Sequence, residues 1–126
     1  MKKTAKSAEC QQQRHKFVQA LNAMDGTWVR FLQDKDVLDI NYSDLYTGLW
    51  AAGAPLRKQE ALLLMRNLSP QTAKKYLDKA VAKGLLIELP DPSDGRAKLI
   101  ALSPDLKGRL EDFFDNAIEI FRKALM

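Results

Sequence analysis

The chain has 126 residues, of which 46% are hydrophobic and 29% are charged, and its formal net charge at pH 7 is +4. Its single cysteine, Cys10, excludes an intrachain disulfide, and no apolar run approaches the roughly 20 residues that a membrane-spanning helix needs. We therefore expect one domain over residues 1–126, in a reducing cytoplasm and without a membrane partner.

The first six residues, MKKTAK, are basic and polar. They look like the start of a secretory signal, but no apolar segment follows them, so export is not expected. We interpret residues 1–6 as a flexible tail.

A long amphipathic helix is predicted over residues 7–34. Its apolar residues recur at helical spacing, and the pattern stays in phase across Gly26. In the alternative interpretation the helix breaks at Asp25-Gly26, because an interior glycine costs about 1 kcal/mol. The residues that set the phase are Phe17, Leu21, Met24, Trp28 and Phe31.

Two shorter helices are predicted next. Ser43 is the candidate N-cap of the first, which Gly53 and Pro55 would end. The second, from Leu56 to about Asn67, is predicted to turn tightly into a third helix, as in a helix-turn-helix. Inward-facing side chains are expected at Leu45, Tyr46, Leu49 and Trp50 in the first, and at Leu62, Met65 and Leu68 in the second.

The third helix begins with the N-cap Ser69 followed by Pro70, and Gly84 is suited to the left-handed position that ends it. Its two faces differ in chemistry, and the outward face is net basic. Residues expected inward are Ala73, Tyr76, Leu77, Ala80 and Val81, and those expected outward are Gln71, Lys74, Lys75 and Asp78.

Two apolar runs, Leu86–Leu89 and Ala97–Leu102, flank the turn-rich PDPSDG and predict a β-hairpin with a long tip. Ser103-Pro104 then predicts the start of a last helix, over residues 104–126. A capped basic helix followed by a hairpin whose tip carries an arginine is typical of a winged helix-turn-helix. The predicted fold is therefore mainly α with a small β-hairpin wing, and residues 43–102 form the DNA-reading lobe.

The last helix has an apolar arc broader than one face needs. On a monomer this arc would expose much apolar surface, so we expect the helices at 7–34 and 104–126 to form a homodimer interface. In the alternative interpretation both helices only wrap one small core. The predicted interface residues are Phe17, Leu21, Phe113, Phe114, Ile118 and Phe121.

The positive charge is concentrated in the reading lobe. From Arg57 to Lys98 there are nine Lys and Arg against five acidic residues, whereas Asp25 to Tyr46 has two basic against five acidic residues. A local excess of this kind permits a polyanionic partner without requiring one.

From Leu45 to Leu110 the chain resembles the multiple antibiotic resistance regulator (MarR) family of winged-helix transcription factors. The similarity is densest in LSPQTAKKYLDKAVAKGLL and PDPSDGRAKLIALSPDLKGRL. It implies a homodimeric regulator that binds double-stranded DNA and often a small aromatic effector. The residues that match the family pattern are Ser69, Thr72, Lys75, Asp78, Lys83, Gly84 and Leu85 in the third helix, Asp94 and Arg96 in the wing, and Ser103.

A helix of about 14 residues fits the major groove, where its first residues would meet base edges and phosphates. At the wing tip, Arg96 is expected in the minor groove, and Asp94 is expected to hold it by a charge-assisted hydrogen bond. In the alternative interpretation this is a solvated face with a surface ion pair. The predicted DNA-binding residues are Ser69, Gln71, Thr72, Lys74, Lys75, Asp94 and Arg96, with Arg57, Lys58, Lys79 and Lys98 positioning the backbone.

Other sites have weaker support. Trp28, Tyr42, Tyr46 and Trp50 are candidates for an effector pocket, although aromatic residues at helical spacing are more often core. A thiol sensor at Cys10 is disfavoured, since no basic residue immediately flanks it and no second cysteine resolves it. Because His15 stands alone, no metal site is expected, and no cofactor is predicted.

Enzyme classes are disfavoured, because the chain has no glycine-rich phosphate loop, nucleophile elbow or paired Cys or His spacing. We predict a sequence-specific DNA-binding transcriptional regulator that acts as a repressor. The alternative is a winged-helix adaptor or antirepressor that contacts protein and does not bind DNA.

Overall fold

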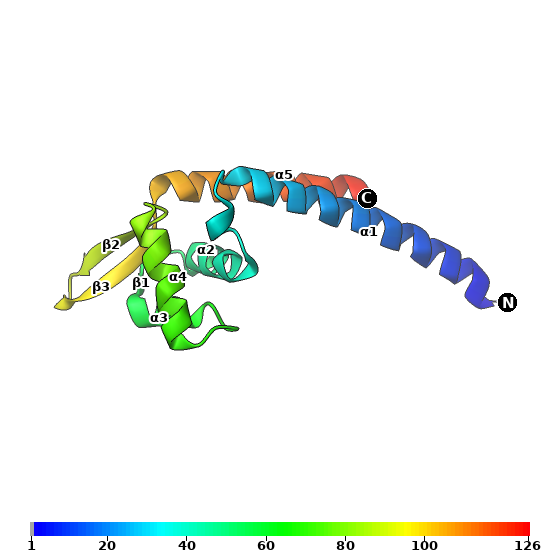
Figure 1. Cartoon of the computed structure of the whole chain (residues 1–126). Helices are drawn as coiled ribbons and strands as arrows, with labels where there is room; N and C mark the ends of the chain where they lie inside the picture. Colours follow the sequence, from blue (N-terminus) through cyan, green and yellow to red (C-terminus); the bar gives the residue numbers. More distant parts are fainter. Residues whose placement is uncertain (1) are drawn as a thin grey trace. The chain divides into compact units, whose positions relative to one another are not determined.

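A computed structural model describes the backbone of residues 2–126 and the side chains of residues 7–126 (Figure 1). Met1 and the side chains of residues 2–6 lie outside the described part. Of the tail predicted over residues 1–6, the backbone of residues 2–6 is described, and it is helical. The chain forms two compact units. We call Asp34–Leu110 the winged unit, and the chain up to Gln33 together with Glu111–Met126 the helical unit.

The helical unit contains α1 (Lys2–Phe31) and most of α5 (Pro104–Leu125). Helix α1 is unbroken across Gly26, which confirms the single long helix and excludes the two-helix alternative. It reaches further toward the N-terminus than the predicted start at residue 7. It ends at Phe31, somewhat before the predicted end.

Aromatic rings hold α1 and α5 together inside the helical unit. The Phe17 and Phe121 ring centroids lie 5.9 Å apart. Farther along α1, the Trp28 ring lies 4.4 Å from Phe31 and 5.1 Å from Phe113. Because residues late in α1 contact residues early in α5, the two helices run antiparallel.

The winged unit begins with a 3-10 turn, η1 (Lys35–Val37), and α2 (Ile40–Ala52). Asp39 caps α2, because its Oδ1 accepts hydrogen bonds from the backbone N–H groups of Asn41 and Tyr42. The predicted cap at Ser43 is therefore wrong, and the helix starts one turn earlier. Its predicted end at Gly53 is confirmed, with a left-handed φ of 71°.

The predicted helix from Leu56 to Asn67 is shorter than expected. Leu56–Arg57 form strand β1, and α3 spans only Lys58–Leu63. Strand β1 was missed because two residues show no alternation, and they become a strand only by pairing with a distant segment. Helix α3 is followed by a turn and by α4 (Pro70–Ala82), which matches the predicted third helix.

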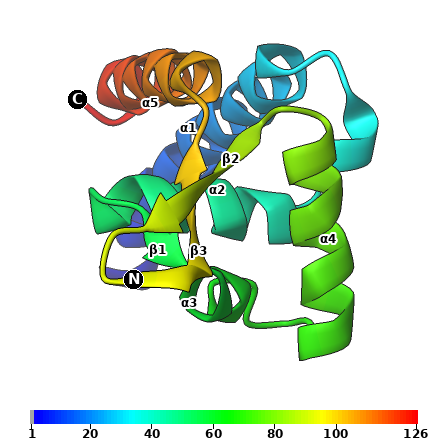
Figure 2. The same cartoon turned by 90° about the vertical axis from the view of Figure 1, so that its left-hand side faces the viewer.

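Strands β2 (Leu86–Asp91) and β3 (Asp94–Leu102) form the predicted hairpin, with a tip shorter than expected. The antiparallel sheet has the order β1-β3-β2, with Leu56 opposite Ile100 and Leu86 opposite Leu102. Figure 2 shows α4 along one side of the winged unit and the hairpin along the other. The fold is thus mainly α with a small β wing, as predicted.

The core of the winged unit lies between α2, α3, α4, the sheet and the start of α5. The Ser103 Oγ caps α5 by accepting a hydrogen bond from Leu106 N at 3.1 Å, as predicted. The side chains that are at most 1% exposed here are Val37, Leu45, Tyr46, Ala61, Met65, Ala73, Leu77, Ala80, Leu86, Ile100, Leu106 and Leu110.

Candidate nucleic-acid interface

Helix α4 presents a polar, basic face to solvent. The Ser69 Oγ caps the helix, accepting a hydrogen bond from Thr72 N at 3.2 Å and donating one to Thr72 Oγ1 at 3.0 Å. The opposite face is fixed in the core by Ala73, Leu77 and Ala80. Gln71, Lys74, Lys75 and Asp78 are exposed, as the periodicity predicted, and Thr72 and Lys79 are exposed as well.

Asp34, which precedes η1, and Asp39, which caps α2, hold α4 in place. Tyr76 Oη donates a hydrogen bond to Asp39 Oδ2 at 2.9 Å, and the Tyr76 ring lies 4.7 Å from that of Tyr42. Near the other end of α4, Lys83 pairs with Asp34. The bond from Lys83 lowers the pKa of Asp34, and the bond to Asp39 raises the pKa of Tyr76. Sequence analysis did not assign roles to either aspartate, although an Asp before a helical segment is a capping signal.

Arg57 of β1 and Lys58, the first residue of α3, both form ion pairs within the winged unit. Lys58 Nζ lies 3.5 Å from Asp78 Oδ1 of α4. Arg57 Nε lies 3.6 Å from Asp91 Oδ2 at the end of β2, although the Arg57 side chain remains 64% exposed. Both cations had been predicted only as phosphate contacts, and their links to α4 and to the wing were not foreseen.

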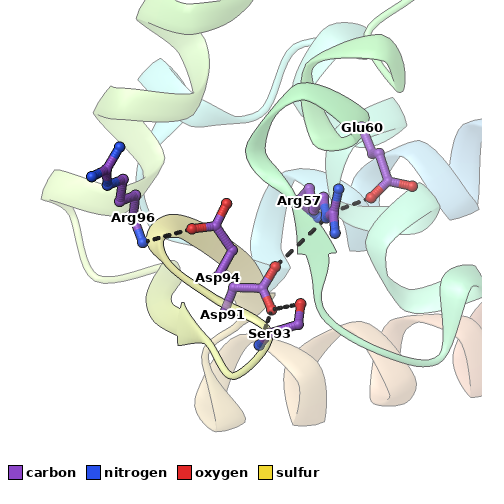
Figure 3. Close-up of polar contacts among 6 residues, drawn as sticks. All are labelled: Arg57, Glu60, Asp91, Ser93, Asp94 and Arg96. Carbon is purple, nitrogen blue, oxygen red and sulfur yellow. Dashed lines mark hydrogen bonds and ion pairs between the residues drawn. The ribbon is translucent and has the colours of Figure 1, made fainter.

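The wing tip is organised by two carboxylates (Figure 3). Asp91 Oδ1 accepts hydrogen bonds from Ser93 N at 2.9 Å and from Ser93 Oγ at 2.8 Å. These bonds, together with the Arg57 guanidinium, lower the pKa of Asp91. Asp94 Oδ1 accepts a hydrogen bond from the backbone N of Arg96 at 3.0 Å.

The predicted contact between Asp94 and the Arg96 guanidinium is therefore replaced by a contact to the Arg96 backbone. In a turn, an aspartate carboxylate reaches the N–H two residues ahead, which explains this geometry. The Arg96 side chain is exposed and points away from Asp94 in Figure 3. Lys98, on the following part of β3, is also exposed.

The aromatic residues predicted for an effector pocket lie in different surroundings. Tyr42 and Tyr46 are 3% and 0% exposed, and Tyr46 Oη donates a hydrogen bond to Val37 O at 3.0 Å. Trp50 is 41% exposed, and Trp28 belongs to the helical unit. Burial raises the pKa of Tyr42 to about 12 and raises that of Tyr46 further. These two tyrosines support the core, as the alternative interpretation held.

An apolar hollow of about 520 Å³ lies elsewhere in the winged unit, around the turn between α3 and α4. Within the described residues no three His, Cys, Asp or Glu side chains come together as metal ligands would. Cys10 is exposed on α1. Over the same described residues, no helix combines the length and apolar character needed to cross a membrane.

No protein-family model and no curated protein matches this chain. Solved structures with 16–18% identity do match its fold. Transcriptional regulator Tm0710 from Thermotoga maritima is 18% identical, with a TM-score of 0.63 over 87% of this chain and 75% of its own. MarR from E. coli, as a mutant complexed with operator DNA, is 18% identical, with a TM-score of 0.56 over 86% of this chain and 76% of its own.

BpsR from Bordetella bronchiseptica, whose DNA binding is regulated by 6-hydroxynicotinic acid, is 16% identical. Its TM-score is 0.51 over 87% of this chain and 81% of its own. The chain therefore has the winged-helix fold of MarR-type regulators.

Proposed function

We propose that this chain is a sequence-specific regulator of transcription that binds double-stranded DNA as a homodimer. The observation that carries the proposal is the exposed basic face of α4, which lies in the same compact unit as a wing with two exposed cations.

The first turns of α4 would enter the major groove. Gln71 has the amide geometry to pair with adenine, and Lys74 and Lys75 would bind guanine or phosphate. The contacts from α4 to Asp34 and Asp39 support this role, because they fix the helix through residues outside its solvent face. A helix held this way loses little conformational freedom when it binds.

The wing would approach the minor groove beside that site. Arg96 would enter a narrow A·T-rich groove, where the negative potential is strongest. Lys79 and Lys98 would contact phosphates and set the register on the duplex. The Lys58–Asp78 ion pair supports a mainly structural role for Lys58, which is to hold α3 against α4.

The helical unit would supply the homodimer interface. Its apolar side chains are only partly covered, with Phe17 46% and Ile118 54% exposed. A hollow of about 530 Å³ near the end of α5 is lined mainly by apolar side chains, including Phe121 and Leu125. A two-fold dimer would read two half-sites about one helical turn apart. Repression then follows from occupancy of a promoter.

A small aromatic effector is a further part of the proposal, supported by the regulation of BpsR, which has the same fold. The two buried tyrosines make the Tyr42–Tyr46 region a poor candidate for it as it stands. The adaptor alternative has no observation in its favour beyond the fold itself.

The test is selection of bound sequences from random duplex DNA, followed by affinity measurements across salt concentrations. We expect Lys74→Ala/Lys75→Ala to weaken binding at least tenfold and to reduce the salt slope by up to about 2, because each phosphate contact contributes about 0.9. Arg96→Ala should reduce the preference for A·T-rich flanks.

The matched control is Lys107→Ala, which removes an exposed lysine from α5, outside α4 and the wing. It should leave affinity within twofold of the unmodified protein. Binding that neither the lysine pair nor Arg96 affects would show that α4 and the wing are not the DNA-binding site. Absence of binding to any duplex would favour the adaptor.

A further inference from the structure

We propose that Arg57 and Asp91 are positioning residues that set the wing for DNA, so that Arg57 acts through Arg96 and not as a phosphate contact. This inference rests on the proposed DNA-binding function. It reassigns Arg57 and gives a role to Asp91, which sequence analysis did not single out.

Asp91 is an acidic residue with little access to water. Its side chain is only 7% exposed, at the end of β2. One carboxylate oxygen, Oδ1, is occupied by the two hydrogen bonds from Ser93. The other, Oδ2, faces Arg57 Nε at 3.6 Å. The same carboxylate therefore shapes the tip of the hairpin and connects it to the helix-turn-helix (Figure 3).

The backbone of Arg57 is fixed to β3 and to α3. In strand β1 it pairs with Leu99 of β3, and its backbone N donates a hydrogen bond to Glu60 Oε1 at 3.2 Å. Strand β1 covers only the part of β3 near Leu99 and Ile100. The hairpin beyond that point extends past β1, so the ion pair supports the wing where strand pairing to β1 has ended.

The position of Arg96 depends on this support. Asp91 lies opposite Asp94 in the hairpin, and Asp94 holds the backbone of Arg96. A displaced tip would carry Arg96 with it, and a guanidinium reads a narrow groove only when it is placed correctly. Arg57 is thus connected to Arg96 through Asp91 and Asp94.

Removing the negative charge of Asp91 tests the proposal, because a positioning role and simple electrostatics predict opposite changes in DNA affinity. Removing a negative charge near DNA should strengthen binding if only electrostatics acted. A positioning role for Asp91 predicts the opposite. We expect Asp91→Asn to weaken binding to the selected duplex three- to tenfold, while the exposed Glu88→Gln on the same strand leaves it unchanged or slightly tighter.

The decisive measurement is a double-mutant cycle with Arg57→Ala and Arg96→Ala on the selected duplex. Arg57→Ala should weaken binding severalfold when it is the only substitution. It should have almost no further effect on binding in a protein that already carries Arg96→Ala. Arg57→Lys, which keeps the charge, should restore part of the affinity. Thermal unfolding of each variant, followed by circular dichroism, checks that the winged unit is intact.

Equal losses from Arg57→Ala with and without Arg96 would overturn the inference and make Arg57 an independent DNA contact. Tighter binding by Asp91→Asn would overturn it as well. If Asp91→Asn fails to fold, the Arg57 cycle alone decides. Failure of the unmodified protein to bind any duplex would instead refute the proposed function.

Discussion

Three tyrosines, Tyr42, Tyr46 and Tyr76, connect α4 to the start of the winged unit. The Tyr42 ring lies 5.9 Å from that of Tyr46 and 4.7 Å from that of Tyr76, and Tyr76 donates to Asp39. Burial raises the pKa of Tyr42 and Tyr46, and the bond to Asp39 raises that of Tyr76. Each hydroxyl therefore resists ionisation as long as the unit is folded.

We predict that Tyr42 and Tyr46 do not ionise near pH 10, the ordinary value for the side chain, in the folded protein, and that Tyr76 ionises at a higher pH than it does in denaturant. Because the folded state holds these protons more tightly than the unfolded state, stability is retained below about pH 10 and lost as pH rises toward 12. Phenolate absorbance, recorded together with circular dichroism, measures both events. In denaturant all three tyrosines should ionise near pH 10. Ionisation of two or more tyrosines near that pH with full helical signal would contradict the burial of Tyr42 and Tyr46.

At the level of elements, two glycines have opposite roles. Gly26 lies inside the continuous helix α1, where glycine is less stable than alanine. Gly84 follows α4 with φ of 77°, a left-handed conformation that an L side chain rarely adopts. An added Cβ at Gly26 would approach only the flexible end of Arg30, at 3.2 Å, and one at Gly84 would meet nothing within 4 Å.

The same substitution at these two positions should therefore change stability in opposite directions. Gly26→Ala should raise the free energy of unfolding by about 0.5–1 kcal/mol. Gly84→Ala should lower it by about 1–2 kcal/mol, through backbone strain alone. Urea denaturation of both variants beside the unmodified protein makes the comparison. An increase for Gly84→Ala would mean that α4 does not end in the left-handed conformation.

At the scale of the whole molecule, the helical unit has an exposed apolar surface that the folding of a single chain does not cover. Side chains about half exposed occur on both of its helices, among them Val18, Val29, Ile118 and Leu125. In the part of α5 that belongs to this unit, no described residue is fully buried. Association with a second copy would remove this surface from water.

We predict that Ile118→Glu shifts the protein from dimer to monomer in size-exclusion chromatography with light scattering. The same variant should weaken DNA binding at least tenfold, because a monomer engages one half-site. Asn116→Glu adds the same charge at an exposed position two residues earlier in α5 and should leave the dimer intact. A monomeric unmodified protein would refute the homodimer and leave the apolar helices to another partner.

Local signals in the sequence determined most of the elements of this protein. Ser69-Pro70, Gly84 and Ser103-Pro104 mark helix ends correctly, because capping depends on residues within one turn. Helical periodicity likewise identified the exposed basic face of α4, since the same spacing that buries Leu77 directs Lys74 and Lys75 outward.

Only the tertiary structure decided how those elements are fixed to one another. Strand β1, the Tyr76–Asp39 bond and the Arg57–Asp91 pair all join residues far apart in the chain. No local pattern specifies such a partner, because a carboxylate accepts equally well from any donor that folding brings to it. The sequence therefore determined which side chains face the proposed DNA site, and the packing determined which of them are held in position for it.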